Sequence, residues 1–416
     1  MKFCDVTIAY NDRSGGIRTY IDEKRRFIEN NTNHEHLLIV PGERDGTEIV
    51  GRSKIVSLEG PLLPKQNAYR FFRSPARIRN VLTEELPDVV ELGSYYMEPW
   101  AAFSYRRRMR ESGRTCLVGG YFHTDVAEAY VAAPLRAAAH SRLEDVSEAL
   151  STIVVKIADV AAAGAEHYIR YVFEHCDIAM AAAPAQASRL NEYGVDRVRV
   201  APMGVDLDVF SPGRRSQSVR ILNGASPETL VLVYAGRLSS EKHVLMLVDA
   251  FDCLPPTRDV QLWMIGDGPL RADVAAAALR NPSVRLLPYE SDRIRFAELL
   301  ASADLYVTAG PHETFGLSVI EAQASGLPVI GVDAGALKER VRPGLGYLGP
   351  VDDPEIMSAN ILRACAERAA IAARARRHVE THFSWNAAFQ RLLSFYESAY
   401  RREDARLPVS SGAAVA

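Results

Sequence analysis

The sequence predicts an α/β protein with two doubly wound domains, each built on a parallel sheet. Three observations support this prediction. Short apolar runs typical of buried parallel strands alternate with helical stretches along the chain. With 416 residues, the chain is too long for one ordinary hydrophobic core. Prolines and a glycine punctuate residues 198–212, which we interpret as the crossing from one domain to the other.

Composition excludes several classes of protein. Hydrophobic residues make up 48% of the chain and the formal net charge is −3, which argues against a disordered chain and against a strongly basic nucleic-acid binder. No uncharged apolar run is long enough to cross a bilayer, and the first ten residues are strand-like, with no charged leader. We therefore expect a cytoplasmic protein. The cysteines are odd in number and lack metal-ligand spacing, as in a reducing compartment: Cys4, Cys116, Cys176, Cys253 and Cys365.

The first half of the chain alternates expected strands and helices. Gly15 and Gly16 lie between the first strand and the first helix, where a phosphate or an acceptor could pass close to the backbone; a plain turn is the alternative. His123 follows a strand, at the edge where open α/β sheets bind ligands; a histidine bonded to nearby backbone is the alternative. The alanine-rich stretch 127–174 is expected to form two or three helices. The expected strands are 3–9, 36–40, 54–58, 89–92, 116–122 and 176–182, with helices at 70–85 and 100–111.

The second half begins with a polar, arginine-rich segment, 213–226, and a buried-strand pattern at 229–235. The loop after that strand carries Arg237 and Lys242. The fork of an arginine and the point charge of a lysine can neutralise a diphosphate without a metal; an ordinary solvated turn is the alternative. Strands are also expected at 261–265, before a tight turn that starts at Gly266, and at 284–288.

Residues 303–333 form the most informative stretch. It reads as a strand at 303–309, a loop at 310–316, a helix at 317–324 and a strand at 329–332. The amides of Gly316, Leu317 and Ser318 should be unpaired at the helix start and favour an anion. Two carboxylates flank this site, one before the helix and one a turn inside it. We expect them to grip hydroxyl groups, one of ribose and one of a sugar; a capping carboxylate plus a solvated helical glutamate is the alternative.

Those two carboxylates, Glu313 and Glu321, stand as E-x7-E inside HETFGLSVIEAQASGLPV. This pattern resembles the signature of the retaining, nucleotide-sugar-dependent glycosyltransferases of family 4, which have the GT-B fold of two Rossmann-like domains around a cleft. The loop G-R-L-x-x-E-K and the P-x-G-V-D-x-x-x-F segment near residue 202 are similar to other parts of the same family. The -HTD- segment and the HETFGL loop look most like the family's mannosyltransferases.

The resemblance implies roles for the residues of the catalytic site. Arg237 and Lys242 would neutralise the leaving diphosphate, and no catalytic metal or further cofactor would be needed. Glu313 and His123 would hold the donor sugar. Glu321 would hold the ribose.

Six further positions are implied as donor-binding through their backbone: Gly15, Gly16, Gly236, Gly266, Gly316 and Leu317. The resemblance also implies domains at 1–200 (acceptor side) and 201–383 (nucleotide-sugar side). A final helix at 384–403 would cross back onto the first domain, before a disordered tail at 404–416.

The partners follow from the same resemblance. The donor would be GDP-mannose or a UDP-hexose, and the acceptor a hydroxyl group of a glycolipid, a polysaccharide precursor or a small molecule, with no nucleic acid involved. Two basic segments with aromatic residues, Arg70 to Arg79 and Arg106 to Arg110, could contact the inner membrane surface; a solvated helix face is the alternative. A sugar-nucleotide epimerase or hydrolase on the same fold, or a non-catalytic sugar-nucleotide binder, are competing functions.

Overall fold

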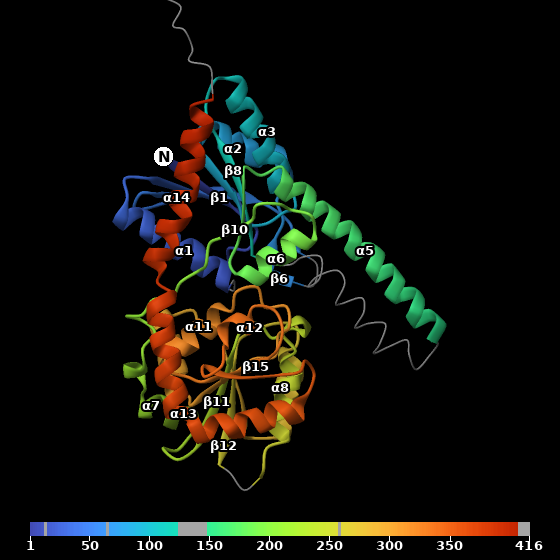
Figure 1. Ribbon diagram of the computed structural model, residues 1–416, viewed down its shortest axis with the longest axis vertical. Coiled ribbons are helices and arrows are strands. Elements are labelled where there is room, and N and C mark those ends of the chain that lie inside the picture. The colour runs from blue at the N-terminus through green and yellow to red at the C-terminus, as the bar shows by residue number, and fades with distance from the viewer. Residues whose placement is uncertain (12–14, 64–65, 124–147, 257–258, 407–416) are drawn as a thin grey trace, which may run out of the picture. The chain divides into compact units, whose positions relative to one another are not determined.

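The computed structural model describes residues 1–11, 15–63, 66–123, 148–256 and 259–406 (Figure 1). The chain separates into two compact units. The N-terminal unit comprises Met1–His123, Glu166–Ala201 and Ala388–Ala416, and the C-terminal unit comprises Thr124–Ala165 and Pro202–Ala387. Our expectations for residues 12–14, 127–147 and 407–416 lie outside the described residues. No helix among the described residues is long and apolar enough to cross a bilayer.

The N-terminal unit contains an eight-stranded sheet in the order β10-β9-β8-β7-β1-β2-β4-β3. All neighbouring pairs are parallel except β3 with β4, because β3 is an antiparallel edge strand that the sequence reasoning missed. A separate hairpin, β5-β6, was also missed. The strands are β1 (Lys2–Val6), β2 (Glu35–Gly42), β3 (Gly46–Val50), β4 (Ser53–Glu59), β5 (Leu62–Leu63), β6 (Gln66–Arg70), β7 (Val89–Leu92), β8 (Leu117–Phe122), β9 (Ile178–Ala181) and β10 (Arg199–Val200).

The helices of this unit differ from expectation at two places, the start of α2 and the end of α14. The helix expected from residue 70 starts at Pro75, because Arg70 ends strand β6. The described part of the 127–174 stretch is one continuous helix, α5. The tail expected from 404 is wrong for 404–406, which remain hydrogen-bonded to α14. The helices are α1 (Gly16–Asn31), α2 (Pro75–Glu85), α3 (Glu98–Glu111) and α6 (Pro184–Glu192), together with α5 (Glu148–Glu174) from Glu166 onward and α14 (Trp385–Asp404) from Ala388 onward.

A buried polar cluster holds α1, α14 and the strands of the N-terminal unit together. The Lys24 ammonium lies 2.9 Å from Asp5 and 3.1 Å from Glu91, and all three side chains are almost fully buried. His36 contacts the same Asp5 carboxylate at 2.7 Å. The Tyr396 hydroxyl, on α14, donates to Glu91 at 2.8 Å. Because every charge has a partner, the cluster avoids the large cost of isolated buried charges.

The C-terminal unit contains a six-stranded parallel sheet in the order β13-β12-β11-β14-β15-β16. Numbered within the unit, this is the order 3-2-1-4-5-6 of a Rossmann sheet, and the seven parallel strands of the N-terminal unit follow the same rule. The strands are β11 (Leu230–Ala235), β12 (Val260–Ile265), β13 (Val284–Leu287), β14 (Leu305–Val307), β15 (Val329–Val332) and β16 (Gly346–Gly349).

Helices connect these strands, as parallel pairing requires. Helix α11 has the bounds that the sequence predicts, because Gly316 precedes it and Ser325-Gly326 ends it. The α-helices are α7 (Gln217–Leu222), α8 (Val244–Asp252), α9 (Arg271–Arg280), α10 (Arg293–Ser302), α11 (Leu317–Ala324), α12 (Leu337–Arg340) and α13 (Pro354–His382), with short 3-10 helices η2 (Pro212–Arg214) and η3 (Ser240–Lys242).

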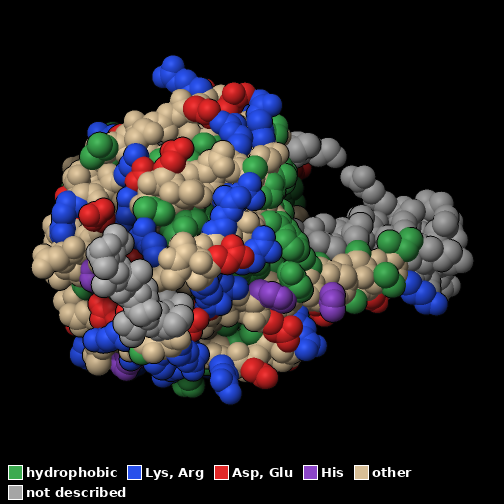
Figure 2. Space-filling view, turned by 90° about the horizontal axis from the view of Figure 1, so that it is seen from above, with side chains coloured by type: hydrophobic (Ala, Val, Ile, Leu, Met, Phe, Trp, Pro, Cys, Tyr) green, Lys and Arg blue, Asp and Glu red, His purple; other side chains and the backbone are tan. Residues whose placement is uncertain are grey.

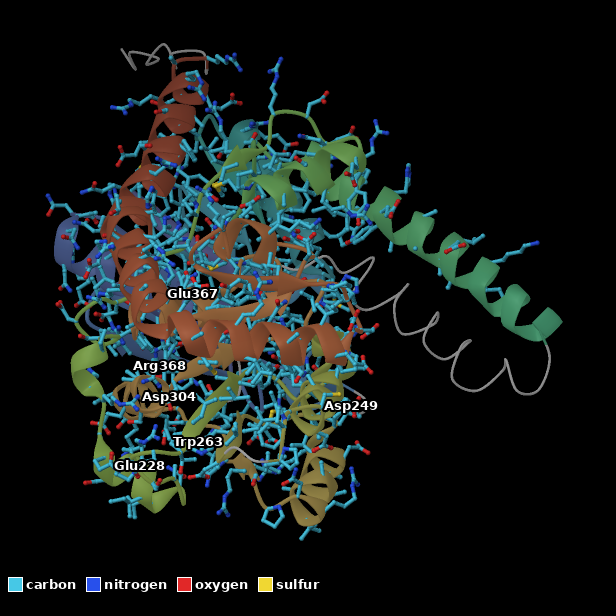
Figure 3. The ribbon with its side chains drawn as sticks, turned by 60° about the horizontal axis from the view of Figure 1, so that its bottom comes forward. Glu228, Asp249, Trp263, Asp304, Glu367 and Arg368 are labelled. Atoms are coloured by element: carbon cyan, nitrogen blue, oxygen red, sulfur yellow. The ribbon has the colours of Figure 1, made fainter. Side chains whose placement is uncertain are left out.

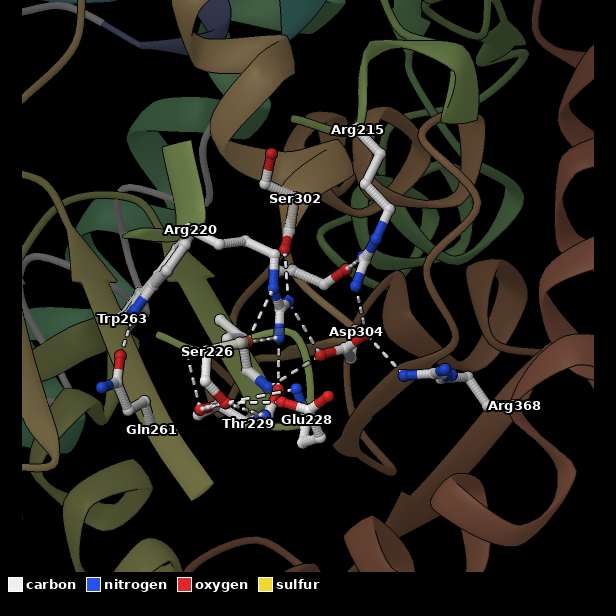
Figure 4. Close-up of polar contacts among 12 residues, drawn as sticks. Arg215, Arg220, Ser226, Glu228, Thr229, Gln261, Trp263, Ser302, Asp304 and Arg368 are labelled. Carbon is white, nitrogen blue, oxygen red and sulfur yellow. Dashed lines mark hydrogen bonds and ion pairs between the residues drawn. The ribbon is translucent and has the colours of Figure 1, made fainter. Parts of the chain in front are cut away.

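Ion pairs attach the arginine-rich segment 213–226 to the C-terminal unit. Arg215 and Arg220 both reach Asp304, at 2.9 and 3.2 Å, and Arg220 is 1% exposed (Figure 4). Arg368, from α13, reaches the same carboxylate (Figures 3 and 4). One carboxylate faces three guanidinium groups, but carbonyl oxygens at the end of α10 accept further hydrogen bonds from two of them. The negative end of that helix dipole therefore offsets the excess positive charge.

Strand order identifies where each unit should bind a ligand. In doubly wound sheets the site lies beyond the carboxyl ends of the strands where the order reverses. That point is between β11 and β14 in the C-terminal unit and between β1 and β7 in the N-terminal unit. The loops after these four strands are therefore the first candidates for function.

Candidate active site

The loops after β11 and β14 meet at the start of α11. The Lys242 ammonium, on the first loop, lies 2.8 Å from Glu313 Oε2, on the second. The other oxygen of Glu313 accepts the backbone N–H of Gly316 at 3.1 Å. Gly316 adopts φ +79°, a left-handed conformation that favours glycine, and is the N-cap of α11. Our expectation of an unpaired Gly316 amide is wrong, because the Glu313 carboxylate accepts it.

The environment of Glu313 keeps it ionised. Burial alone would raise the pKa of Glu313, but the Lys242 ammonium and the N–H groups of Gly316 and Phe315 stabilise the carboxylate and lower its pKa below the usual value of 4.5. Glu313 is thus a carboxylate at neutral pH, with one oxygen on a cation and the other on the backbone. These two contacts fix the conformation of the loop and hold the Lys242 ammonium close to the start of α11.

Tyr306, from β14, connects the end of β11 to the start of α11 through its hydroxyl group. Its hydroxyl lies 3.0 Å from the carbonyl oxygen of Ala235, the last residue of β11, and 2.8 Å from the hydroxyl of Ser318 on α11. The tyrosine is fully buried, so these two hydrogen bonds replace its contacts with water. The strand tip that leads to Gly236 and Arg237 is therefore tied to the start of α11.

Two glycines let neighbouring turns approach each other. Gly236 donates its N–H to the carbonyl oxygen of Ile265 at 3.0 Å, across the tips of β11 and β12. A Cβ on Gly266 would lie 2.0 Å from the Gly236 carbonyl oxygen, so only glycine fits there. The half-buried Arg237 follows, and its carbonyl oxygen accepts the Tyr234 hydroxyl at 2.9 Å. Arg237 and Lys242 thus share one rigidly held loop.

Glu321 has a partner that the sequence reasoning missed. It is almost fully buried on α11 and pairs with the Arg293 guanidinium, at the start of α10. Burial raises the pKa of Glu321, and the Arg293 charge opposes that rise without cancelling it. Arg293 also lies over the Phe210 ring, 4.7 Å from its centroid. The alternative of a solvated helical glutamate is therefore wrong for Glu321. A pairing across 28 residues leaves no local signal in the sequence.

A second arginine, Arg340, contacts the loop between β14 and α11. Arg340 is 4% exposed and lies between two rings, 4.2 Å from the centroid of Phe315 and 4.8 Å from that of Phe383. Its Nε donates to the Phe315 carbonyl oxygen at 2.9 Å. Ala336 donates its N–H to the Glu313 carbonyl oxygen at 2.8 Å. Residues 336–340 therefore hold both ends of the segment from Glu313 to Phe315.

In the N-terminal unit, the predicted residues lie at the carboxyl edge of its own sheet. Gly15 is exposed just before α1, and Gly16 begins that helix. His123 directly follows β8, is 5% exposed, and stacks on Tyr121 with 4.2 Å between ring centroids. Burial lowers the pKa of His123 to about 3, so its imidazole is neutral at physiological pH. A neutral imidazole can donate and accept one hydrogen bond each, as a sugar hydroxyl requires.

Comparison with known proteins identifies the family. Residues 14–209 match the family described as Glycosyltransferase Family 4, and residues 229–367 match Glycosyl transferases group 1. A GDP-mannose-dependent alpha-(1-6)-phosphatidylinositol dimannoside mannosyltransferase of Mycobacterium tuberculosis is 32% identical over 95% of both chains. The chain belongs to glycosyltransferase family 4.

Two further comparisons agree with this assignment. A GDP-mannose-dependent alpha-mannosyltransferase of Corynebacterium glutamicum is 28% identical over 78% of this chain and 71% of its own. Sucrose-phosphate synthase from Thermosynechococcus elongatus has the same fold, with a TM-score of 0.75 over 96% of this chain and 99% of its own, at 16% identity. The predicted GT-B fold is confirmed. The chain is a glycosyltransferase that transfers a hexosyl group from a nucleotide sugar.

The two basic segments of this glycosyltransferase are largely neutralised by carboxylates. Arg70 pairs with Glu43 at 3.0 Å, and Arg110 reaches Asp177 at 3.0 Å. On the face that Figure 2 shows, basic and acidic side chains are interspersed rather than gathered into one positive field. Further pairs join Arg73 to Glu59, Arg77 to Asp45, Arg106 to Asp177 and Arg110 to Glu403.

Neither unit groups potential metal ligands in its described residues: no three His, Cys, Asp or Glu side chains there are arranged to hold a metal ion. The positive charge beside Glu313 comes instead from Lys242, within hydrogen-bonding distance.

Proposed function

We propose that the chain is a retaining mannosyltransferase that uses GDP-mannose as its donor and a hydroxyl group of a lipid-linked glycan or polyol as its acceptor. The pairing of Lys242 with Glu313 at the start of α11 carries this proposal, because it puts a cation at the switch point of a Rossmann sheet. The name of the M. tuberculosis relative includes GDP-mannose and a phosphatidylinositol mannoside, which supports both the donor and the class of acceptor. A UDP-hexose is the alternative donor.

The diphosphate of the donor binds where Lys242 and the helix start meet. Arg237 and Lys242 supply positive charge from one loop, and the amides at Gly316 and Leu317 supply hydrogen bonds from the other. The Gly316 amide now bonds to Glu313, so the carboxylate must give up that bond, or share it, when the donor binds. Gly236 and Gly266 bring the adjacent turns close to the nucleotide.

The two carboxylates and the histidine bind hydroxyl groups. Glu321, held in place by Arg293, accepts hydrogen bonds from the ribose. Glu313 accepts hydrogen bonds from the mannose, and His123, as a neutral imidazole, contacts the same sugar. Gly15 and Gly16 lie on the loop after β1, where the N-terminal unit allows close approach to its backbone.

The reaction we propose breaks the bond between the sugar and the diphosphate first. Arg237 and Lys242 stabilise the negative charge that develops on the leaving diphosphate. A diphosphate oxygen then takes the proton of the acceptor hydroxyl as that hydroxyl attacks the oxocarbenium-like carbon from the same face. The configuration at the anomeric carbon is thereby retained without a covalent enzyme intermediate and without a catalytic metal.

A donor panel tests the proposal. Purified protein is mixed with GDP-mannose, UDP-glucose, GDP and UDP, and its thermal unfolding is followed. A ligand at 100 times its Kd stabilises the folded state by about 2.7 kcal/mol, so the correct donor should raise Tm clearly. The anomeric configuration of the product is then read by NMR with an offered lipid acceptor. A free sugar with every acceptor, an epimerised donor, or binding without turnover would each contradict the proposal.

We also propose that the protein is cytoplasmic and contacts the inner membrane surface. The segment from Arg106 to Arg110 includes the exposed Arg107 and Arg108, and it is the better of the two candidate segments. Replacing these two arginines with glutamate should reduce co-sedimentation with vesicles that contain anionic lipid, since each basic residue near such a surface contributes about 1 kcal/mol. Equal co-sedimentation of both proteins would contradict the proposed contact.

A further inference from the structure

An aromatic cleft opens at the carboxyl edge of the N-terminal sheet. Its volume is about 690 Å³, within the usual range for a small-molecule site. It lies beside the loop after β7, which is a switch-point strand, and the turn after β4. Its lining consists of Pro61, Phe71, Phe72, Arg73, Tyr95, Tyr96, Met97 and Tyr168.

The loop that presents three of these side chains is held by a buried carboxylate. Glu98, at the start of α3, is 0% exposed. It accepts the N–H of Tyr96 at 2.9 Å and that of Met97 at 2.7 Å, and the Ser94 hydroxyl also donates to it. In the described residues Glu98 has no cationic partner, so its hydrogen-bonding capacity serves this loop. The conformation of the cleft wall is therefore fixed by the fold.

Two of the three tyrosine hydroxyl groups in the described lining donate to the protein's own backbone rather than to the cleft. The Tyr168 hydroxyl donates to the Tyr95 carbonyl oxygen at 2.7 Å, and the Tyr95 hydroxyl donates to the carbonyl oxygen of Tyr121. Phe71 and Tyr96 meet edge to face, with ring centroids 5.2 Å apart. A sugar in this cleft would leave hydroxyl groups without hydrogen-bond partners, which weakens binding. The faces of the aromatic rings in the lining are apolar, so the cleft suits a hydrocarbon chain.

We propose that this cleft binds the hydrocarbon chain of the acceptor, so that the acceptor is an amphiphile with its reactive hydroxyl group on a polar head. This inference rests on the proposed function, because it assigns a part of that function's acceptor. The sequence YRFFR, at the start of the basic segment from Arg70 to Arg79, supplies Phe71, Phe72 and Arg73 to the cleft. Arg73 is the one cation among the described residues of the lining, and it pairs with Glu59.

Burial of a chain should give a graded gain in affinity. Each methylene group that is fully buried contributes about 0.8 kcal/mol, or roughly a fourfold change in Kd. A short chain-length series therefore distinguishes a hydrocarbon site from a site for the polar head, whose affinity would not depend on the chain.

The experiment measures the binding of methyl, hexyl and octyl glucosides, below their critical micelle concentrations, by isothermal titration calorimetry. The octyl glucoside should bind at least tenfold more tightly than the hexyl glucoside, with no binding of the methyl glucoside. Tyr96→Ala and Phe71→Ala should each remove most of that difference. The matched control is Ile49→Ala, on the edge strand β3, because Ile49 is also an exposed apolar side chain of the same unit.

The outcomes separate this inference from the proposed function. Tyr96 is 42% exposed, so its truncation should leave the fold intact, which far-UV circular dichroism checks. Equal affinity for all chain lengths, or an unchanged series in both cleft variants, would overturn the inference even if GDP-mannose binds. If the unmodified protein does not bind GDP-mannose but its affinity for the glucosides still increases with chain length, the proposed donor is refuted and this inference stands.

Discussion

Lys242→Met is the most direct perturbation of the candidate site. The methionine keeps the length of the side chain and removes its charge. In the unmodified protein the ammonium lies 2.8 Å from Glu313, and at an effective dielectric constant of about 20 two unit charges at that distance attract by about 6 kcal/mol before desolvation is counted. Only part of this attraction survives as net stabilisation, because both groups lose contacts with water.

Two consequences follow from the loss of the ammonium. The pKa of Glu313 should rise, since burial is then opposed only by backbone N–H groups. Turnover should fall by about a hundredfold or more, because one of the charges that stabilise the leaving diphosphate is gone. A carboxylate with a lowered pKa stabilises the fold above its unfolded pKa, and that stabilisation is lost as pH falls through the folded value. In Lys242→Met, the loss of this stabilisation should begin at a higher pH, because the pKa of Glu313 in the folded state is higher.

The assay is steady-state turnover of GDP-mannose between pH 4 and 9, together with urea unfolding at both ends of that range. Lys242→Arg keeps a cation and should retain more activity than Lys242→Met. Lys338→Met is the matched control, because Lys338 is an exposed lysine of the same unit with only a 3.7 Å pair to Asp333. Turnover of Lys242→Met within threefold of the unmodified protein, or an unshifted acidic limb, would refute the reasoning.

Three further predictions concern neighbouring features. Gly316→Ala should lower the free energy of unfolding by about 1–2 kcal/mol and weaken donor binding, because φ +79° is strained for alanine; urea unfolding and GDP titration measure both. Asp304→Asn should cost about 3–5 kcal/mol in urea unfolding, since three guanidinium groups lose their shared carboxylate, and a loss below 1 kcal/mol would refute the role of that cluster. Arg293→Met should raise the pKa of Glu321 further, so raising the pH from 5 to 8 should destabilise the variant relative to the unmodified protein; the same pH dependence in both proteins would contradict it.

Much of the fold could be predicted from local patterns. The bounds of α11 and β15 follow from glycine, serine and proline at their ends, and these residues act within one turn of the chain. Sequence patterns do not predict the hairpin β5-β6, and its last residue, Arg70, falls within the helix expected at 70–85; only the pairing of the two strands defines the hairpin. Residues 404–406 were assigned to a tail because composition does not reveal their hydrogen bonds to α14.

The residues of the candidate site also fall into two groups, those that local patterns predict and those that they do not. Lys242 and Glu313 could be placed at strand tips from the sequence, because each follows a recognisable buried strand. The partner of Glu321 could not, since Arg293 comes from another helix and no local pattern links the two. The burial of Arg220 was also missed, because an arginine in a polar stretch gives no sign of a carboxylate 84 residues away.

The hydrogen bond from Tyr396 to Glu91 has a consequence for synthesis of the protein. The buried cluster around Lys24 needs a hydroxyl group from a helix near the end of the chain. Every strand of the C-terminal sheet, from Leu230 to Gly349, leaves the ribosome before that helix does. All strands of the C-terminal sheet are therefore synthesised before the N-terminal unit, which was made first, receives the hydroxyl group of Tyr396. A nascent chain arrested before Tyr396 would hold the first unit incomplete.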